Sequence, residues 1–524
     1  MANDAVLEGF SSPVRAWFTS SFPAATDAQS RGFAEIVAGN HTLISAPTGS
    51  GKTLAAFLVA IDRLVTLDPE HVSTTRVLYV SPLRALAFDV EKNLRAPIVG
   101  IRHAAERLGA SFREPLVAMR TGDTSARDRQ RMLRNPPDIL ITTPESLYLM
   151  LTSSARSTLA NVDTVIIDEI HAVAATKRGA HLALSLERLE ELTAKPPQRI
   201  GLSATQRPLE EVARFLGGYR EGTPRPVSIV DAGARKTLEV EVVVPVEDMG
   251  ELGKVTHELR SGPATAAGVE RRTSIWPSIT PRILELVQQH RSTIIFCNAR
   301  RGAERLAAQL NELAADLGLS TADGASTTGD FVKAHHGSLA REQRIVIEDQ
   351  LKRGQLRAIV ATSSLELGID MGAVDLVIQV ESPGAVSRGL QRIGRAGHAV
   401  GSPSRGKVFP KHRHDLLEVA VVARRMLDAE IESTRYLRNP LDVLAQHIVA
   451  HVAMHPDVSV AALTAMIKRC ANFAELTDEV RNNVLDLLAG RYPSEEFRDL
   501  KPRIVWDRIA DTLRARDQGW FRRW

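Results

Sequence analysis

Cysteine is almost absent from this chain, since only Cys297 and Cys470 occur among its 524 residues. Two lone, distant cysteines cannot form a zinc cluster or a disulfide framework, and they are typical of a reducing compartment. The sequence also lacks a run of about 18 apolar residues that could span a membrane. Residues 1–10 lack the basic and apolar segments of a signal peptide. We therefore expect a cytoplasmic protein.

A strong excess of positive charge is missing as well. The formal net charge is +4, and residues 501–524 alone hold seven basic and three acidic side chains. The first 500 residues therefore sum to zero, and any binding of nucleic acid must depend on local patches. At about 150 residues per domain, the length predicts three or four domains.

Short apolar runs alternate with helix-like stretches through most of the chain. Such repeated units predict parallel sheets covered by helices. The first part has strands expected at 42–45, 77–80, 139–141, 165–167 and 200–202, with an amphipathic helix at 54–67. Residues 261–281 are rich in Gly, Pro, Ser and Thr, which indicates a linker. A second unit follows, with strands expected at 293–296, 358–361 and 376–380 and a helix at 301–313.

After about Thr434 we expect helices and no further strands. Asn439-Pro440 is typical of a helix start, with Asn as the cap and Pro at the first position. Thr477 could cap another helix that ends at Gly490. This small helical domain is either a packing appendage or a winged helix.

Residues 46–53 fit the pattern of a phosphate-binding loop, with Ala in place of the first Gly. Backbone N–H groups of such a loop and of the following helix cradle phosphate oxygens. The Lys side chain reaches the β- and γ-phosphates, and the Thr hydroxyl ligates Mg²⁺. The residues expected to contact ATP here are Pro47, Thr48, Gly49, Ser50, Gly51, Lys52 and Thr53.

An acidic pair, Asp168 and Glu169, closes the expected strand at 165–167. Carboxylates at the end of a buried strand need a partner such as a metal. We expect Asp168 to hold Mg²⁺ and Glu169 to orient and deprotonate the attacking water. Taken alone the pair could cap the next helix, but Lys52 favours the first interpretation. Gln29 lies 23 residues before Lys52, and its amide could pair with an adenine edge.

Two features mark the second unit. Arg392 and Arg395 lie on a segment punctuated by glycine at 391–398, which suits an arginine finger and equally a solvated basic helix end. Residues 362–370 follow an expected strand, and their hydroxyls and N–H groups could bind nucleic-acid phosphates. Asp370 could contact a ribose or an arginine, although a polar turn would look the same.

Taken in chain order, these segments resemble the motifs of superfamily 2 helicases. The matching segments are 26–29, 46–53, 81–86, 121–124, 142–146, 168–171, 203–205, 295–298, 362–370 and 391–398. Finer features resemble the Lhr (large helicase-related) family. They are Asp-Glu-Ile-His at 168–171, His-His-Gly-Ser-Leu at 335–339, Gly-Ile-Asp-Met-Gly at 368–372, and Arg-Asn-Pro-Leu-Asp-Val-Leu at 438–444. One departure is His398, where a second arginine often stands.

The resemblance implies an α/β fold, with two RecA-like parallel-sheet domains in tandem and then a small, mainly helical winged-helix-like domain. The implied bounds are 1–230, 231–432 and 433–524. It implies that ATP binds in the cleft between the two sheet domains and that its hydrolysis depends on a nucleic-acid single strand. It also implies 3′-to-5′ movement on DNA and unwinding of DNA and RNA:DNA duplexes.

The resemblance also implies roles by position. Catalysis would use Lys52, Asp168, Glu169, Arg392 and Arg395. Further nucleotide contacts would come from Gln29, Gly368 and Asp370, metal binding from Thr53 and Asp168, and coupling to domain motion from His171, Ser203 and Thr205. Nucleic acid would contact Pro82, Arg84, Thr121, Gly122, Thr143, Pro144, Asn298 and Thr362.

Lhr proteins usually continue beyond this length, and residues 515–524 look unlike the family. The tail is either a DNA-gripping segment or a truncated end, and we favour the second interpretation, with an incomplete winged helix. An ATP-driven helicase is the favoured function. The alternatives are a nucleic-acid-stimulated ATPase without productive unwinding and a non-catalytic nucleic-acid-binding fragment.

Overall fold

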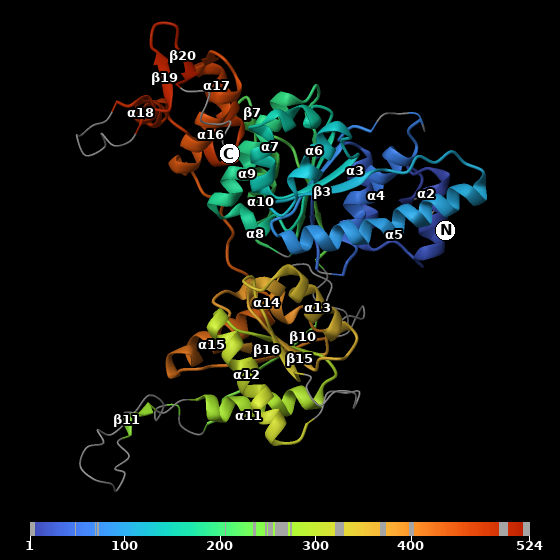
Figure 1. Cartoon of the computed structure of the whole chain (residues 1–524), viewed down its shortest axis with the longest axis vertical. Helices are drawn as coiled ribbons and strands as arrows, with labels where there is room; N and C mark the ends of the chain where they lie inside the picture. The colour runs from blue at the N-terminus through green and yellow to red at the C-terminus, as the bar shows by residue number, and fades with distance from the viewer. Residues whose placement is uncertain are drawn as a thin grey trace. The chain divides into compact units, whose positions relative to one another are not determined.

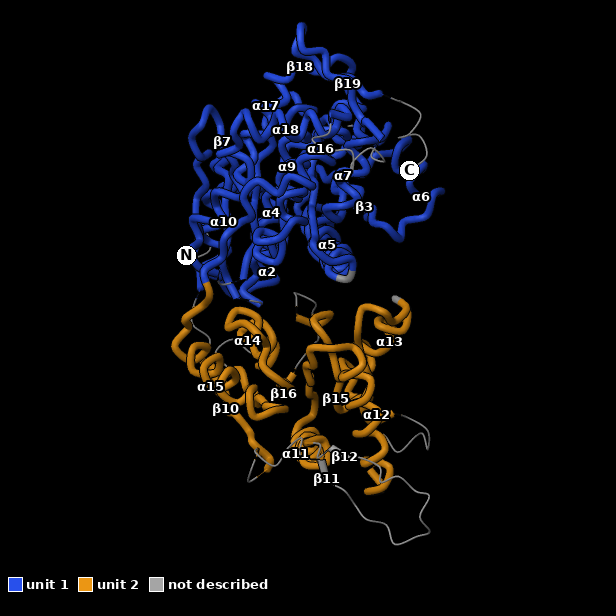
Figure 2. The backbone as a smooth tube through the Cα atoms, turned by 90° about the vertical axis from the view of Figure 1, so that its left-hand side faces the viewer, with its two compact units in different colours: residues 1–233, 433–524 blue, residues 234–432 orange. Residues whose placement is uncertain are grey.

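The computed structural model forms two compact units, residues 1–233 with 433–524 and residues 234–432 (Figure 1, Figure 2). No helix among the described residues is long and apolar enough to cross a membrane. The described residues are 6–47, 49–68, 70, 73–204, 206–233, 237–246, 249, 255–256, 271–272, 275–319, 330–366, 374–397, 403–491 and 501–516.

The first unit contains a seven-stranded parallel sheet with the order β3-β4-β2-β5-β6-β1-β9. Its strands are β1 (Thr42–Ser45), β2 (Val77–Val80), β3 (Val117–Arg120), β4 (Ile139–Thr142), β5 (Thr164–Ile167), β6 (Gln198–Ser203) and β9 (Ser228–Asp231). Leu43 and Leu78 enter one apolar core, whereas their neighbours Ile44 and Tyr79 enter the other. A sheet buried on both faces explains why its strands are continuous apolar runs. The five strands expected here are confirmed, and β3 and β9 are additional.

Helices cover both faces of this sheet, as the alternation of segments predicts. They are α2 (Ser12–Ser21), α3 (Asp27–Val37), α4 (Lys52–Val65), α5 (Arg84–Leu108), α6 (Ala126–Arg134), α7 (Pro144–Leu151), α8 (His171–Ala174), α9 (Lys177–Leu192) and α10 (Leu209–Gly217). The expected helix at 54–67 corresponds to α4, which begins two residues earlier, directly after the phosphate-loop segment.

The second unit contains a six-stranded parallel sheet with the order β10-β17-β16-β13-β15-β14. Its strands are β10 (Leu238–Val242), β13 (Thr293–Phe296), β14 (Val332–His335), β15 (Ala358–Ala361), β16 (Leu376–Val380) and β17 (Ser404–Phe409). The helices are α11 (Trp276–Gln289), α12 (Arg300–Asp316), α13 (Arg341–Lys352), α14 (Val386–Ile393) and α15 (Arg413–Asp428). The three strands and the helix expected in this unit are confirmed.

The expected linker at 261–281 is wrong in its last part, where α11 begins at Trp276. Pro277 lies in the first turn of this helix, where a missing N–H costs little. Ile279 and Ile283 are buried in the same apolar core as strand residues such as Ile295 and Val360. Local composition therefore suggested a loop where tertiary packing forms a helix. Within that segment, residues 261–270, 273 and 274 lie outside the described residues.

The C-terminal segment holds α16 (Leu441–Met454), α17 (Val460–Arg469) and α18 (Asp478–Ala489). It also holds a three-stranded antiparallel sheet of β18 (Val458–Ser459), β20 (Thr512–Ala515) and β19 (Ile504–Asp507). The expectation of no strands after Thr434 is wrong, because these strands are partly exposed and include polar or charged residues, so they give no continuous apolar run. Thr477 caps α18 and Gly490 ends it with φ +84°, as expected. At α16 the cap is Pro440 rather than Asn439.

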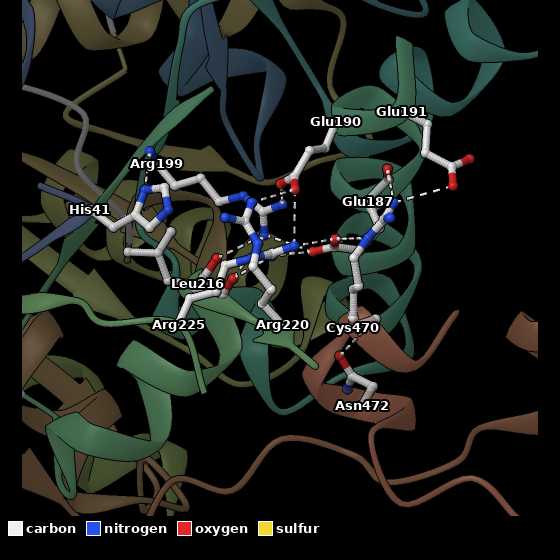
Figure 3. Close-up of polar contacts among 12 residues, drawn as sticks. His41, Glu187, Glu190, Glu191, Arg199, Leu216, Arg220, Arg225, Cys470 and Asn472 are labelled. Atoms are coloured by element: carbon white, nitrogen blue, oxygen red, sulfur yellow. Dashed lines mark hydrogen bonds and ion pairs between the residues drawn. The ribbon is translucent and has the colours of Figure 1, made fainter. Parts of the chain in front are cut away.

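A buried charge network joins the C-terminal segment to the first sheet (Figure 3). Glu187 on α9 accepts hydrogen bonds from Arg199 at 2.8 Å, from Arg225 at 3.0 Å and from Arg469 at 3.1 Å. Burial alone would raise the pKa of Glu187, but the charges of Arg199 and Arg225 lower it to about 2. The apolar core beside this network is continuous between the two segments, since Leu444 and Ile448 of α16 belong to it.

Candidate nucleotide and nucleic-acid site

The phosphate-loop segment connects the carboxyl end of β1 to the start of α4. Gly49 and Gly51 both have positive φ, +83° and +77°, which lets the backbone turn sharply into the helix. The Lys52 ammonium is buried and donates to the Ala46 carbonyl at 3.4 Å and to Glu169 Oε1 at 3.5 Å. Thr53 lies half-buried in the first helical turn. Thr48 lies outside the described residues.

Gln29 packs against this loop from the start of α3. Its Oε1 atom accepts a hydrogen bond from Thr26 N at 3.0 Å, and Thr26 Oγ1 accepts from Gln29 N at 3.2 Å, which forms a capping box. Thr26 Oγ1 also donates to the Ser50 carbonyl at 2.8 Å. The amide oxygen expected for adenine is therefore engaged in the helix cap, and Nε2 faces the loop. A Cβ atom on Gly51 would lie 2.4 Å from that nitrogen.

The acidic pair follows β5 at the same edge of the sheet, because the carboxyl ends of parallel strands meet there. Asp168 is buried, accepts a hydrogen bond from the Tyr79 hydroxyl and accepts another from Glu169 N at 2.9 Å. Burial, followed by the neighbouring charge of Glu169, raises the pKa of Asp168 to about 6. Glu169 has φ +43°, a strained conformation for a residue other than glycine. The structure thus brings Lys52, Asp168 and Glu169 together.

His171 connects this pair to the end of β6. Burial lowers the pKa of His171 to about 4, so its ring is neutral. Ala204 N donates to His171 Nδ1 at 3.2 Å, and Ser203 Oγ lies 3.3 Å from the same nitrogen. Because Nδ1 accepts a hydrogen bond, the proton of the neutral ring is on Nε2. Thr205 lies outside the described residues.

The residues expected to contact nucleic acid in the first unit follow β2, β3 and β4 at the same sheet edge. Arg84 pairs with Asp123 at 2.5 Å, and a Cβ atom on Gly122 would lie 2.6 Å from its guanidinium. Thr121 is buried, and its N–H donates to Thr124 Oγ1 at 2.9 Å. Thr143 caps α7, which begins at Pro144, and its hydroxyl accepts from Ser146 N at 3.4 Å.

Two residues that sequence reasoning missed hold these loops in place. Arg178 donates to the Pro82 carbonyl at 2.8 Å and to Glu145 at 2.5 Å, so it ties the loop after β2 to α7. Tyr79 is the only polar side chain of β2, and this was the one available signal for its hydrogen bond to Asp168. Arg178 stands two residues after the helix-capping Thr176, and no local pattern marks it.

In the second unit, Arg392 is fully engaged by its own surroundings. Its guanidinium donates to Glu366 Oε2 at 3.0 Å, to Gln379 Oε1 at 2.8 Å and to Asn298 Oδ1 at 3.1 Å. The guanidinium carbon also lies 5.3 Å from the centre of the Phe296 ring. Arg392 thus joins β16 to the segments that follow β13 and β15. All three hydrogen-bond partners belong to the second unit.

The other expected residues of the second unit surround this arginine. Arg395 is buried and donates to the Glu366 carbonyl at 2.8 Å. Asn298 is exposed and donates to the Ser382 carbonyl at 2.8 Å. Thr362 precedes a short helical turn, and its N–H donates to the His335 carbonyl at 3.2 Å. Gly368 and Asp370 lie outside the described residues.

Three family models match the chain. They are the DEAD/DEAH box helicase over residues 26–213, the helicase conserved C-terminal domain over 278–400, and the large helicase-related protein winged helix domain over 424–523. The matches divide the chain in the order that the motifs predict.

Curated relatives match nearly the whole chain. A Lhr helicase/probable uracil glycosylase of Mycolicibacterium smegmatis is 53% identical over 97% of this chain and 34% of its own length. An ATP-dependent helicase Lhr-Core protein 2 of Thermococcus barophilus is 41% identical over 96% of this chain and 55% of its own length. The chain therefore spans about a third of the first relative and about half of the second.

A solved structure, Mycobacterium smegmatis helicase Lhr bound to ssDNA and AMP-PNP, has a TM-score of 0.85 and 52% identity to this chain. The similarity covers 98% of this chain and 61% of that one. The expected fold, two RecA-like parallel-sheet domains followed by a winged-helix-like domain, is confirmed.

Proposed function

We propose that this chain, which belongs to the Lhr family of superfamily 2 helicases, hydrolyses ATP to ADP and phosphate to move 3′ to 5′ along single-stranded DNA and to unwind DNA or RNA:DNA duplexes. The observation that carries the proposal is the convergence of Lys52, Asp168 and Glu169 in one buried site, where Lys52 lies 3.5 Å from Glu169. Support for the strand comes from the related structure bound to ssDNA and AMP-PNP. The direction and the kinds of duplex rest on the family resemblance.

ATP is the substrate, and the first unit supplies the groups that suit its phosphates. We assign Lys52 to the β- and γ-phosphates and the backbone of 47–51 to the phosphate oxygens. Glu169 would orient and deprotonate the attacking water. Gln29 would use its Nε2 donor for adenine, because its oxygen already caps α3.

The donor set at this site fits Mg²⁺. Asp168 is a buried carboxylate beside a second one, which favours a cation, and Thr53 offers a hydroxyl in the adjacent helical turn. Among the described residues no group of three or more His, Cys, Asp or Glu could hold a metal ion. Mg²⁺ usually takes one or two protein ligands together with substrate phosphates and water. When bound, the ion would neutralise charge on the phosphates.

In the second unit we assign the stabilisation of phosphoryl charge to Arg395. Arg392 is better described as a positioning residue, because Glu366, Gln379 and Asn298 already occupy its donors. Gly368 and Asp370 stay predicted nucleotide contacts, and Thr362 a predicted strand contact, on their motif positions alone.

The strand would run along the loops after β2, β3 and β4. Pro82, Arg84, Thr121, Gly122, Thr143 and Pro144 all lie there, and Asn298 is their proposed counterpart in the second unit. We assign coupling between hydrolysis and domain motion to His171, Ser203 and Thr205. The division into domains at 1–230, 231–432 and 433–524 and a cytoplasmic location stay proposals too.

The test is ATP hydrolysis by the purified chain with no nucleic acid, with single-stranded DNA and with single-stranded RNA. If one kind of strand stimulates hydrolysis and Glu169→Gln abolishes that stimulation, the result supports a motor coupled to nucleic acid. It also shows whether the chain moves on DNA or on RNA. Displacement of a labelled strand from a duplex with a 3′ tail, but not with a 5′ tail, supports the direction. Absence of hydrolysis under all three conditions would refute the proposal.

A further inference from the structure

Helix α6 carries a row of exposed arginines next to the proposed strand contacts. Arg127, Arg131 and Arg134 are exposed and follow a spacing of four and then three residues, which places them on one face of the helix. We call these three residues the arginine stripe. Among the described residues, none of the three has an ion pair or a hydrogen bond through its side chain.

Two nearby carboxylates of the described part of the chain are engaged elsewhere and do not pair with this charge. Asp128, the acidic residue of α6, is turned back to the helix start, where it accepts from Ser125 Oγ at 2.7 Å. Asp123, in the preceding loop, pairs with Arg84 instead. Like charges at this spacing destabilise a helix, and a helix of nine residues with none buried is marginal in water. An anionic partner would offset both costs.

The surroundings add further positive charge. Arg120 on β3 and Arg129 on α6 are the added charges. They act on each other, since burial, together with the charge of Arg129, lowers the pKa of Arg120. Arg129 also donates to the Gly122 carbonyl at 3.1 Å, which fixes α6 to the loop expected to contact nucleic acid. The stripe therefore continues the proposed strand path, at the edge of the sheet where β3 is the last strand.

We propose that the arginine stripe binds the phosphodiester backbone of the single strand beyond its contacts at Thr121 and Gly122. Residues 127–134 extend about 10 Å along the helix axis, which matches about three phosphates of one strand. Arginine suits this ligand because its guanidinium binds phosphate oxygens in a two-pronged manner. Contacts of this kind position the strand without reading its sequence. This inference rests on the proposed function and adds a contact surface outside its motifs.

The test compares two triple variants of the full chain. Arg127→Gln/Arg131→Gln/Arg134→Gln removes the stripe while keeping helix propensity. The matched control, Arg95→Gln/Arg102→Gln/Arg107→Gln, removes the same charge from α5 of the same unit. In that control set Arg95 is paired with Glu91 and Arg102 with Glu114. Binding to fluorescent DNA and RNA single strands is measured by anisotropy between about 50 and 200 mM salt.

We expect the slope of log affinity against log salt to become shallower by about 2 in the stripe variant and to stay unchanged in the control. A shallower slope with DNA, with RNA or with both supports the proposal and identifies the strand. The corresponding triple Arg→Lys variant should restore most of the slope because it keeps the charge. The proposal is overturned if the slopes for DNA and for RNA are both unchanged in the stripe variant, or if the control variant shows an equal change.

The two proposals fail in distinguishable ways. If the unaltered chain neither binds strands nor hydrolyses ATP faster with them, both are refuted. If it does both, and the stripe variant binds like the control, only the stripe is refuted.

Discussion

Arg469, the last residue of α17, donates to Glu187 on α9 at 3.1 Å, although 282 positions separate the two residues in the chain. The same carboxylate already binds Arg199 and Arg225, and only 1% of its side chain is exposed. One buried acid thus orients three arginines and fixes the C-terminal segment on the first sheet.

Replacing Glu187 with Ala should lower the free energy of unfolding by roughly 3–5 kcal/mol, because it leaves buried arginines without their main partner. Arg469→Ala should cost about 1 kcal/mol, since that side chain is 26% exposed. Thermal unfolding of the full chain measures both. Arg438→Ala, which breaks the exposed pair with Glu475, is the control and should change nothing measurable. Equal losses from Glu187→Ala and Arg438→Ala would contradict this account.

Acid should loosen the contact between α16 and α9 below about pH 6.5. Burial lowers the pKa of His181 to about 4, that of His451 to about 3, and that of His447 well below its usual value. Below pH 6.5 the unfolded chain therefore binds more protons than the folded chain does. The free energy of unfolding, which is at its full value above pH 6.5, decreases as the pH falls towards 4.

His447→Leu should remove part of this acid lability. Each such histidine contributes a loss of about 1.4 kcal/mol per pH unit below 6.5. The difference in unfolding free energy between pH 7 and pH 5 should therefore shrink by roughly 2 kcal/mol in the variant. An exposed histidine, His103→Leu, is the control. The same pH dependence in both variants would contradict the assignment.

Gly51→Ala should weaken ATP binding by more than about tenfold, because the new methyl group would collide with Gln29 in a backbone conformation that disfavours side chains. Gly39→Ala is a matched control, since Gly39 has φ +83° but nothing lies within 4 Å of the position that its new methyl group would take. Isothermal titration with an ATP analogue measures the difference. Equal weakening in the two variants would contradict a specific role for the contact between residue 51 and Gln29.

Arg395→Lys and Arg392→Lys should fail in different ways. Arg395→Lys should reduce strand-stimulated hydrolysis by about 1000-fold with ATP binding retained, as for loss of an arginine finger. Arg392→Lys should chiefly lower the melting temperature, because a lysine cannot satisfy Glu366, Gln379 and Asn298 together. If Arg392→Lys keeps full stability and loses hydrolysis, the positioning role is wrong.

Central strands were the most predictable part of the fold. The bounds of β1, β2, β13, β15 and β16 agree with the expected ranges residue for residue, because strands buried on both faces are unbroken apolar runs. Edge strands were missed: β3 and β14 each include a basic residue and are only partly buried. The internal strand β17 was missed too, because Arg405 and Lys407 interrupt its apolar pattern. The strands of the C-terminal segment were missed for the same reason, since β19 and β20 are partly exposed and each includes a charged residue.

The site shows the same division. Lys52, Asp168 and Glu169 could be placed from sequence, since a phosphate loop and a strand-end carboxylate are local patterns with a known chemistry. Tyr79 and Arg178 could not, because their partners lie 89 and 96 positions away and only tertiary folding brings them together. The engagement of Arg392 by three partners of its own unit is also invisible locally.

The first unit is assembled from two segments of the chain, residues 1–233 and 433–524, with the whole second unit between them. During synthesis the partners of Arg469, and the apolar surface that Leu444 and Ile448 cover, emerge from the ribosome more than 200 residues before those side chains do. The second unit is continuous in sequence and can complete its core first. At about 5–20 residues per second, we therefore expect newly made chains to expose an apolar, charged surface on α9 for roughly 10–50 s, and this surface is where a chaperone would be needed.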